Sequence, residues 1–179
     1  MKRLLFTIAG FCVVPLALAQ NAPPIQEITK QIIKSAQGYA NAISCPDVVI
    51  SPKEIAALTP YKTLDDRMEA KYAVLWSGDI GCAGGSGTSG THVSIITVSI
   101  GDSFVVDPRL SSPIIQFETP VRTISRIVGN TRDTLILEGK EYADNDANCC
   151  PSITVRFTLR VDEKGNWKLV EKKVLPARK

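Results

Sequence analysis

Histidine is almost absent from this sequence: His92 is the only one among 179 residues, and no two cysteines have the C-x-x-C spacing. Zinc sites usually combine several histidine and cysteine ligands at short, regular spacing. The sequence therefore argues against a metal, and we expect no cofactor. A hydrolase of the Ser-His-Asp type needs only one histidine, so that chemistry stays open around His92.

The sequence also has no excess of either charge. It contains 21 basic and 18 acidic residues, a net charge of +3. Removing residues 1–19 takes away Lys2 and Arg3 and leaves 19 basic against 18 acidic residues, a net charge of +1. Because only a strong positive field steers a protein to nucleic acid or anionic lipid, we expect neither as a partner.

Long apolar runs are absent except near the N-terminus. The basic start Met1-Lys2-Arg3 is followed by the apolar run Leu4–Leu18 and by the small-x-small site Ala17-Leu18-Ala19, the pattern of a secretory signal peptide. Cys12 follows the bulky Phe11, which suits lipoprotein processing poorly. We expect a signal peptide at 1–19, a single domain at 20–179 without a membrane span, and a periplasmic or secreted location.

Helical periodicity is clearest just after the leader. Apolar residues recur at spacings of three and four, at Ile25, Ile28, Ile32, Ala36, Tyr39 and Ile43. This spacing predicts an amphipathic helix of about 18–20 residues that packs on a core. The capping box Ser51-Pro52-Lys53-Glu54 predicts a short second helix through Leu58, which Pro60 ends.

The remainder of the chain favours strands joined by short connections. Lys71–Trp76 is apolar on both faces, and His92–Ile100 predicts a bulged or doubly buried strand. Further strands are expected at Phe104–Val106, Ile114–Phe117, Thr123–Val128, Thr134–Glu138, Ile153–Val161 and from Trp167 onwards. We therefore predict an α+β fold, with the N-terminal helix packed on a twisted, mainly antiparallel sheet of about six strands.

The stretch Asp144–Ser152 collects oxygen-bearing side chains beside two adjacent cysteines. Asp144, Asp146 and Asn148 follow each other at i, i+2 and i+4, as at the start of an EF-hand loop. A calcium loop also needs a glutamate at position 12, where this chain has Val155. The pattern favours a turn-bonding loop before the Ile153 strand, and a structural ion site remains an alternative.

The glycine-rich segment Gly84–Gly90 precedes His92. Ser86 or Ser89 could act as a nucleophile with His92 as base, and Asp79 or Asp107 could orient the imidazole. The G-x-S-x-G elbow, however, needs a strand-to-helix turn, and a strand follows here. We therefore interpret the segment as a hairpin loop and His92 as a surface residue of a strand.

The run DNDANCCPS resembles the D-x-x-CCP-[ST] signature of small exported bacterial proteins of the LppP/LprE lipoprotein type. The resemblance spans Lys71–Val170 and includes Tyr72–Trp76, Gly78-Asp79 and the run Gly84–Thr88. The family often has a longer acidic Gly-Asp turn where this chain reads Gly78–Ala83. The resemblance implies a fold and an exported location, and it implies no settled activity.

Four cysteines remain after the leader: Cys45, Cys82, Cys149 and Cys150. An even number in an exported chain predicts disulfides. The family resemblance favours Cys45–Cys82 together with Cys149–Cys150. In the rival pairing, Cys45 and Cys82 each bond to one member of the adjacent pair.

These observations predict a non-catalytic periplasmic or secreted module that binds a partner, for which a cell-envelope protein is the expected class. No complete catalytic set is visible in the sequence. The alternatives are a Ser/His-type hydrolase around His92 and a structural ion-binding domain at Asp144–Asn148. If the loop before the Ile153 strand carries a function, the candidate residues are Asp144, Asp146, Asn148 and Ser152.

Overall fold

The computed structural model describes residues 22–45, 48–84, 89–147 and 150–176. Within them lie one α-helix, α1 (Ile25–Ile43), and three short 3-10 turns, η1 (Pro52–Glu54), η2 (Leu64–Glu69) and η3 (Pro108–Leu110). The strands are β1 (Ile55–Thr59), β2 (Lys71–Asp79), β3 (Ser89–Val98), β4 (Phe104–Val106), β5 (Thr123–Asn130), β6 (Thr134–Glu141), β7 (Ile153–Val161) and β8 (Trp167–Val174).

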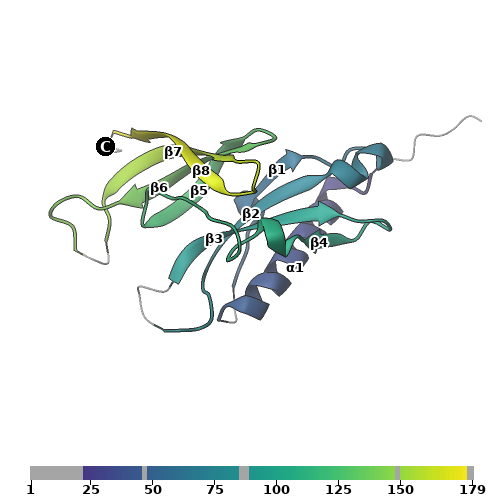
Figure 1. The fold of residues 1–179 in the computed structure, drawn as a ribbon, viewed down its shortest axis with the longest axis horizontal. Helices are drawn as coiled ribbons and strands as arrows, with labels where there is room; N and C mark the ends of the chain where they lie inside the picture. The colour runs from purple at the N-terminus through teal and green to yellow at the C-terminus, as the bar shows by residue number, and fades with distance from the viewer. Residues whose placement is uncertain (1–21, 46–47, 85–88, 148–149, 177–179) are drawn as a thin grey trace, which may run out of the picture.

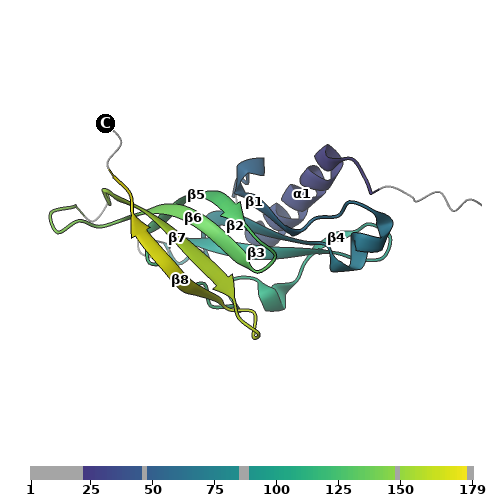
Figure 2. The ribbon, with the colours of Figure 1, turned by 90° about the horizontal axis from the view of Figure 1, so that it is seen from above.

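The strands form two antiparallel sheets, in the orders β1-β2-β3-β4 and β5-β6-β7-β8. Helix α1 lies on one side of the β1–β4 sheet, and the β5–β8 sheet lies on the other side (Figures 1 and 2). The α+β prediction is confirmed. The single sheet of about six strands is wrong, because the second half of the chain forms a sheet of its own.

Two apolar cores hold the three layers together. Between α1 and the first sheet, Ile28 and Ile32 pack with Val74, Trp76 and Ile96. The second core lies between the sheets and combines first-sheet residues with those of β6, β7 and β8, namely Ala73, Leu75, Val93, Ile95, Leu137, Phe157 and Trp167. Strand β2 thus contributes alternate residues to both cores, which explains why its sequence is apolar throughout.

The predicted helix over Ser51–Leu58 is wrong beyond its first turn. The capping box is present, since Glu54 Oε2 accepts a hydrogen bond of 2.7 Å from the Ser51 N–H. The chain then extends as β1, in which Ala56 pairs with Ala73 of β2 and Ala56 and Leu58 are buried. Pairing with a neighbouring strand overrides the local helical signal here.

Two other strand predictions need correction. The register between β2 and β3 is continuous from Lys71 to Asp79, so the doubly buried alternative is right and the bulge is wrong. Ile95 faces the second sheet and Ile96 faces α1. Ile114–Phe117 is not a strand, because only Phe117 forms an isolated bridge, with Trp167.

Candidate functional site

Cys45 and Cys82 form a disulfide whose Cα atoms are 5.0 Å apart. The bond ties the end of α1 to the end of β2, and the Cys45 N–H donates to the Asp79 carbonyl oxygen at 3.2 Å. The rival pairing, in which Cys45 and Cys82 each bond to one of the adjacent cysteines, is therefore wrong. Cys149 lies outside the described residues, so its bond to Cys150 stays a prediction.

The Asp144–Ser152 loop is organised by Asp146. Its Oδ2 accepts hydrogen bonds of 2.7 Å from the backbone N–H groups of Ala143 and Ser152. The Ala143 N–H is the main reason that the pKa of this carboxyl lies below its ordinary value. Asp146 therefore fixes the turn, as the loop interpretation predicts.

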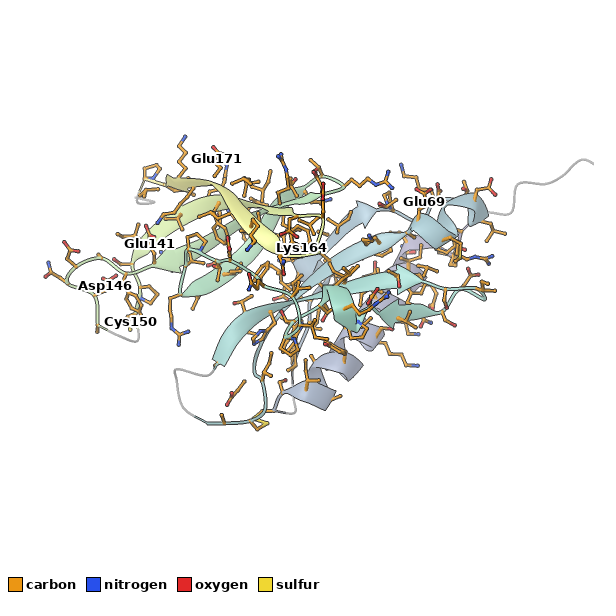
Figure 3. All side chains as sticks on the ribbon, viewed as in Figure 1. Glu69, Glu141, Asp146, Cys150, Lys164 and Glu171 are labelled. Carbon is orange, nitrogen blue, oxygen red and sulfur yellow. A yellow bond between two sulfur atoms is a disulfide. The ribbon has the colours of Figure 1, made fainter. Side chains whose placement is uncertain are left out.

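This geometry does not support an ion-binding role for the same loop. Asp144 is exposed, Ser152 contributes its N–H to Asp146, and Asn148 lies outside the described residues. No group of three or more His, Cys, Asp or Glu residues suited to a metal occurs in the part of the chain that the structure describes. Asp146 and Cys150 lie at the opposite end of the molecule from Glu69 (Figure 3).

His92 lies on β3, as expected, and it is partly buried because its ring packs beside an aromatic side chain. Its ring lies 4.6 Å from the Trp76 ring, centroid to centroid, and its Nε2 is 3.1 Å from the Gly78 carbonyl oxygen. Burial lowers the pKa of the imidazole below its ordinary value, and the contact with Gly78 partly opposes that shift. Packing against the Trp76 ring therefore disfavours the protonated form of His92.

The acids considered for a catalytic triad have other partners. Asp79 Oδ2 accepts the Gly84 N–H at 2.8 Å, and Asp107 binds the Arg109 guanidinium at 3.0 Å. Among the described residues, no carboxylate or hydroxyl forms a hydrogen bond with His92. Ser86 lies outside the described residues. The catalytic arrangement considered for the sequence is thus not assembled by the residues that can be placed.

We expect His92→Phe to flatten the pH dependence of stability without affecting function. In the unfolded chain the imidazole titrates near pH 6.5, roughly. Its pKa is lower in the folded protein, so the unfolded state binds more protons and the free energy of unfolding falls as pH drops through that window. Urea unfolding of the wild type and of His92→Phe at about pH 7.5 and about pH 5.5 measures how much the free energy of unfolding of each protein changes with pH. An equal change in the free energy of unfolding between the two pH values in both proteins would contradict the lowered pKa of His92.

A cavity of about 230 Å³ opens between the two sheets at one end of the sandwich. Its apolar wall combines residues from β1, β3, η3, β7 and β8, namely Leu58, Ile95, Leu110, Val161 and Trp167. A second cavity of about 350 Å³ shares Lys71, Arg132 and Val161 with it. We call these two adjoining cavities the end cleft.

Two residues that line the end cleft, Lys71 and Trp167, have a side-chain N–H donor without a hydrogen-bond acceptor within the described residues. The Trp167 side chain is 1% exposed, and its indole Nε1 is buried without a partner. Lys71, at the first position of β2, has no hydrogen bond from its Nζ within the described residues, and its positive charge contributes to lowering the pKa of Asp107. A buried N–H without an acceptor is uncommon in folded proteins and costs free energy. Because Trp167 Nε1 has almost no accessible surface, it is an unsatisfied group of the core behind the cleft wall and is not a donor that faces the cleft.

Sequence reasoning missed this cleft. The strand predicted from Trp167 onwards is present as β8, but a strand prediction does not place Trp167 beside a cavity. Lys71 and Arg132 belong to segments separated by about sixty residues, and only the stacking of two sheets brings them to the same cavity. No motif in the sequence signals this cleft.

The comparisons with family models, curated proteins and solved structures found no match to this chain. No helix in the described part of the chain is long and apolar enough to cross a membrane.

Proposed function

We propose that this protein is a non-catalytic periplasmic or secreted module that binds a component of the cell envelope in the end cleft. The observation that carries the proposal is the end cleft itself, in which an apolar wall lies beside the basic side chains of Lys71 and Arg132. Clefts with apolar walls and a few polar groups are the usual form of binding sites.

Two observations support an exported location for this module. The first is the leader pattern at residues 1–19, with its basic start and small-x-small site. The second is the Cys45–Cys82 bond, since disulfides persist mainly in oxidising compartments. The resemblance to the LppP/LprE lipoprotein type agrees with both.

Binding is favoured over catalysis because the reactive residues are used elsewhere. The His92 Nε2 contacts a backbone carbonyl, and Asp107 is paired with Arg109. A general base must lie within hydrogen-bond reach of the group that it deprotonates. The end cleft, in contrast, combines an apolar wall with the basic residues Lys71 and Arg132 and has no histidine or cysteine in its lining.

Site-specific photo-crosslinking in the exporting host tests this proposal. A benzoylphenylalanine at Glu163, on the cleft, is expected to give a discrete adduct with a cell-envelope component. The same probe at Lys34, on the exposed side of α1, provides the comparison. Leu110→Trp enlarges a side chain of the cleft wall and should abolish the adduct, because the added ring occupies the cavity.

Val105→Trp is the matched control, because it places the same ring on an exposed position of β4 that does not line the cleft. It should leave the Glu163 adduct unchanged. Equal adducts from Glu163 and Lys34, or an adduct that survives Leu110→Trp, would contradict binding in the end cleft.

A further inference from the structure

We infer that the larger cavity of the end cleft, which measures about 350 Å³, binds a neutral sugar unit of a cell-envelope glycan. We call it the wide cavity. This inference rests on the proposed function and adds the chemical class of the ligand. It follows from an uncovered part of the first sheet, from hydroxyl groups without partners on that part, and from charges that cancel around it.

The floor of the wide cavity is a row of side chains on the first sheet. The register pairs Thr59 with Lys71 and Lys71 with Thr97, so the row crosses β1, β2 and β3. Register partners in an antiparallel sheet lie on the same face. Figures 1 and 2 show the β5–β8 sheet displaced along the first sheet, so that the end of the first sheet near β4 lies outside it. The three floor residues therefore keep partial exposure.

Two hydroxyl groups on this floor are available to a ligand. Thr59 and Thr97 are partly exposed, and neither hydroxyl forms a hydrogen bond with another residue in the described part of the chain. A threonine hydroxyl both donates and accepts, so a group that also does both satisfies it fully. The hydroxyl groups of a sugar are of this kind.

The charges around the wide cavity cancel. Its lining has two bases, Lys71 and Arg132, and two acids, Glu69 and Asp133. The charged groups next to them bring two more of each sign, namely Asp107, Arg109, Arg160 and Asp162. The exposed neighbours Glu163 and Lys164 on the last hairpin turn also oppose each other. The cavity therefore has no excess charge that would select an anion or a cation.

The ion pairs at the cavity are long and exposed, which leaves both members able to bind a hydroxyl. Glu69 and Arg132 are 3.4 Å apart, and Asp133 and Arg160 are 3.5 Å apart, with every one of these side chains more than half exposed. Charge-assisted hydrogen bonds are normally about 2.7–2.9 Å long. A sugar hydroxyl can accept from the guanidinium and donate to the carboxylate, whereas an ion would attract one member and repel the other.

The adjoining cavity of about 230 Å³ favours a sugar that has an apolar substituent. Leu110 and Val161 line this cavity and are partly exposed, so a methyl group that leaves water there gains free energy. Both cavities are lined by Lys71, Arg132 and Val161, so one ligand can contact both. An N-acetylated sugar combines hydroxyl groups with such a methyl group, and N,N′-diacetylchitobiose is the appropriate probe.

NMR titration of the isotope-labelled mature chain with diacetylchitobiose tests the inference. The backbone amide signals of Lys71, Thr97 and Arg132 should shift saturably, with a Kd of about 1 mM, as expected for a small open site. The Kd should be the same at about 50 mM and about 500 mM salt, because a neutral ligand makes no interaction that salt screens.

A pair of threonine variants tests the hydroxyl contact. Thr97→Val removes one hydroxyl from the floor and should weaken diacetylchitobiose binding by about fivefold, the change expected for the loss of one neutral hydrogen bond. Thr158→Val is the matched control. Thr158 also lies inside a strand, between the core residues Phe157 and Leu159, so its side chain points to the outer face of the second sheet. This variant should bind like the wild type.

A series of monosaccharides tests the neutral charge of the ligand. N-acetylglucosamine should bind more tightly than glucuronic acid, which is an anion, and more tightly than glucosamine, which is a cation near neutral pH. Cellobiose lacks the acetyl groups and should bind more weakly than diacetylchitobiose. Tighter binding of either charged sugar would overturn the assignment of a neutral ligand.

Failure of this inference can be distinguished from failure of the proposed function. No saturable shift with diacetylchitobiose up to about 20 mM, or equal affinities of Thr97→Val and Thr158→Val, would overturn the sugar assignment. If the Glu163 adduct still depended on Leu110 in that case, the proposed function would stand and the cleft would bind another component. An adduct that contains only polypeptide would also overturn the inference, in favour of a protein partner.

Discussion

Replacing Cys45 and Cys82 together with serine is expected to lower the free energy of unfolding by about 3–4 kcal/mol. The bond joins residues separated by 37 positions and ties α1 to the end of β2. A cross-link that closes a loop of this length removes many conformations from the unfolded chain, and the stabilisation grows with loop length. Denaturant unfolding of the oxidised protein and the double variant measures the difference.

The adjacent cysteines provide the comparison. A bond between Cys149 and Cys150 would close almost no chain, so replacing both with serine should change the free energy of unfolding little. Asp146, through its bonds to Ala143 and Ser152, would continue to fix the loop. A large loss from the Cys149/Cys150 variant with a small loss from the Cys45/Cys82 variant would contradict the pairing described here.

The elements that the sequence predicted well are those with long, regular periodicity. The helix over Ile25–Ile43 and the strand over Ile153–Val161 were both expected, because their apolar residues repeat at 3.6 and 2 residues. Residues 55–59 were not expected as a strand. Their helical start signal is local, whereas their pairing with β2 depends on a partner about seventeen residues away.

The division into two sheets could not be predicted from local patterns. A strand that is apolar on both faces needs a layer on each side, and Lys71–Trp76 indicated this correctly. The first layer was assigned to the helix, but nothing in the sequence identified the second layer as β6, β7 and β8. Ala73 and Leu75 of the first sheet share a core with Leu137 and Phe157 of the second sheet, and this contact arises only when the two sheets pack together.

The candidate site was even harder to predict from local sequence patterns than the division into two sheets. Lys71, Arg132 and Trp167 belong to three different hairpins or connections, and each has an ordinary role when considered alone. Motif reasoning instead selected Asp144–Ser152 and His92, whose side chains the structure uses for a turn and for packing against Trp76. A binding cleft without a sequence motif becomes visible only when distant segments are brought together.

Glu138→Gln is expected to lower the free energy of unfolding by about 2 kcal/mol at neutral pH. The Glu138 side chain is 5% exposed, and it accepts hydrogen bonds of 2.6 Å from both Arg126 on β5 and Arg156 on β7. The amide keeps the shape but removes the charge that both guanidinium groups share. Because each arginine is about half exposed, water solvates the two cations in the variant, and the loss stays below that for a fully buried pair.

The loss should depend on pH with a defined sign. The hydrogen bond from Arg156 is the main cause that lowers the pKa of Glu138, and Arg126 adds to it. A carboxyl whose pKa is lower in the folded than in the unfolded state stabilises the protein above its unfolded pKa, about 4.3. That contribution is lost as pH falls through the folded-state pKa, so the wild type and Glu138→Gln should converge in stability at low pH.

Denaturant unfolding at about pH 7 and about pH 3 measures both arms of this prediction. Glu118→Gln is the matched control, because Glu118 is paired with Lys168 at 2.6 Å with both side chains well exposed. Exposed ion pairs of this kind contribute little to stability, so this variant should unfold like the wild type. A difference in the free energy of unfolding between wild type and Glu138→Gln that stays constant down to pH 3 would contradict the assignment of the loss to the charge of the Glu138 carboxylate.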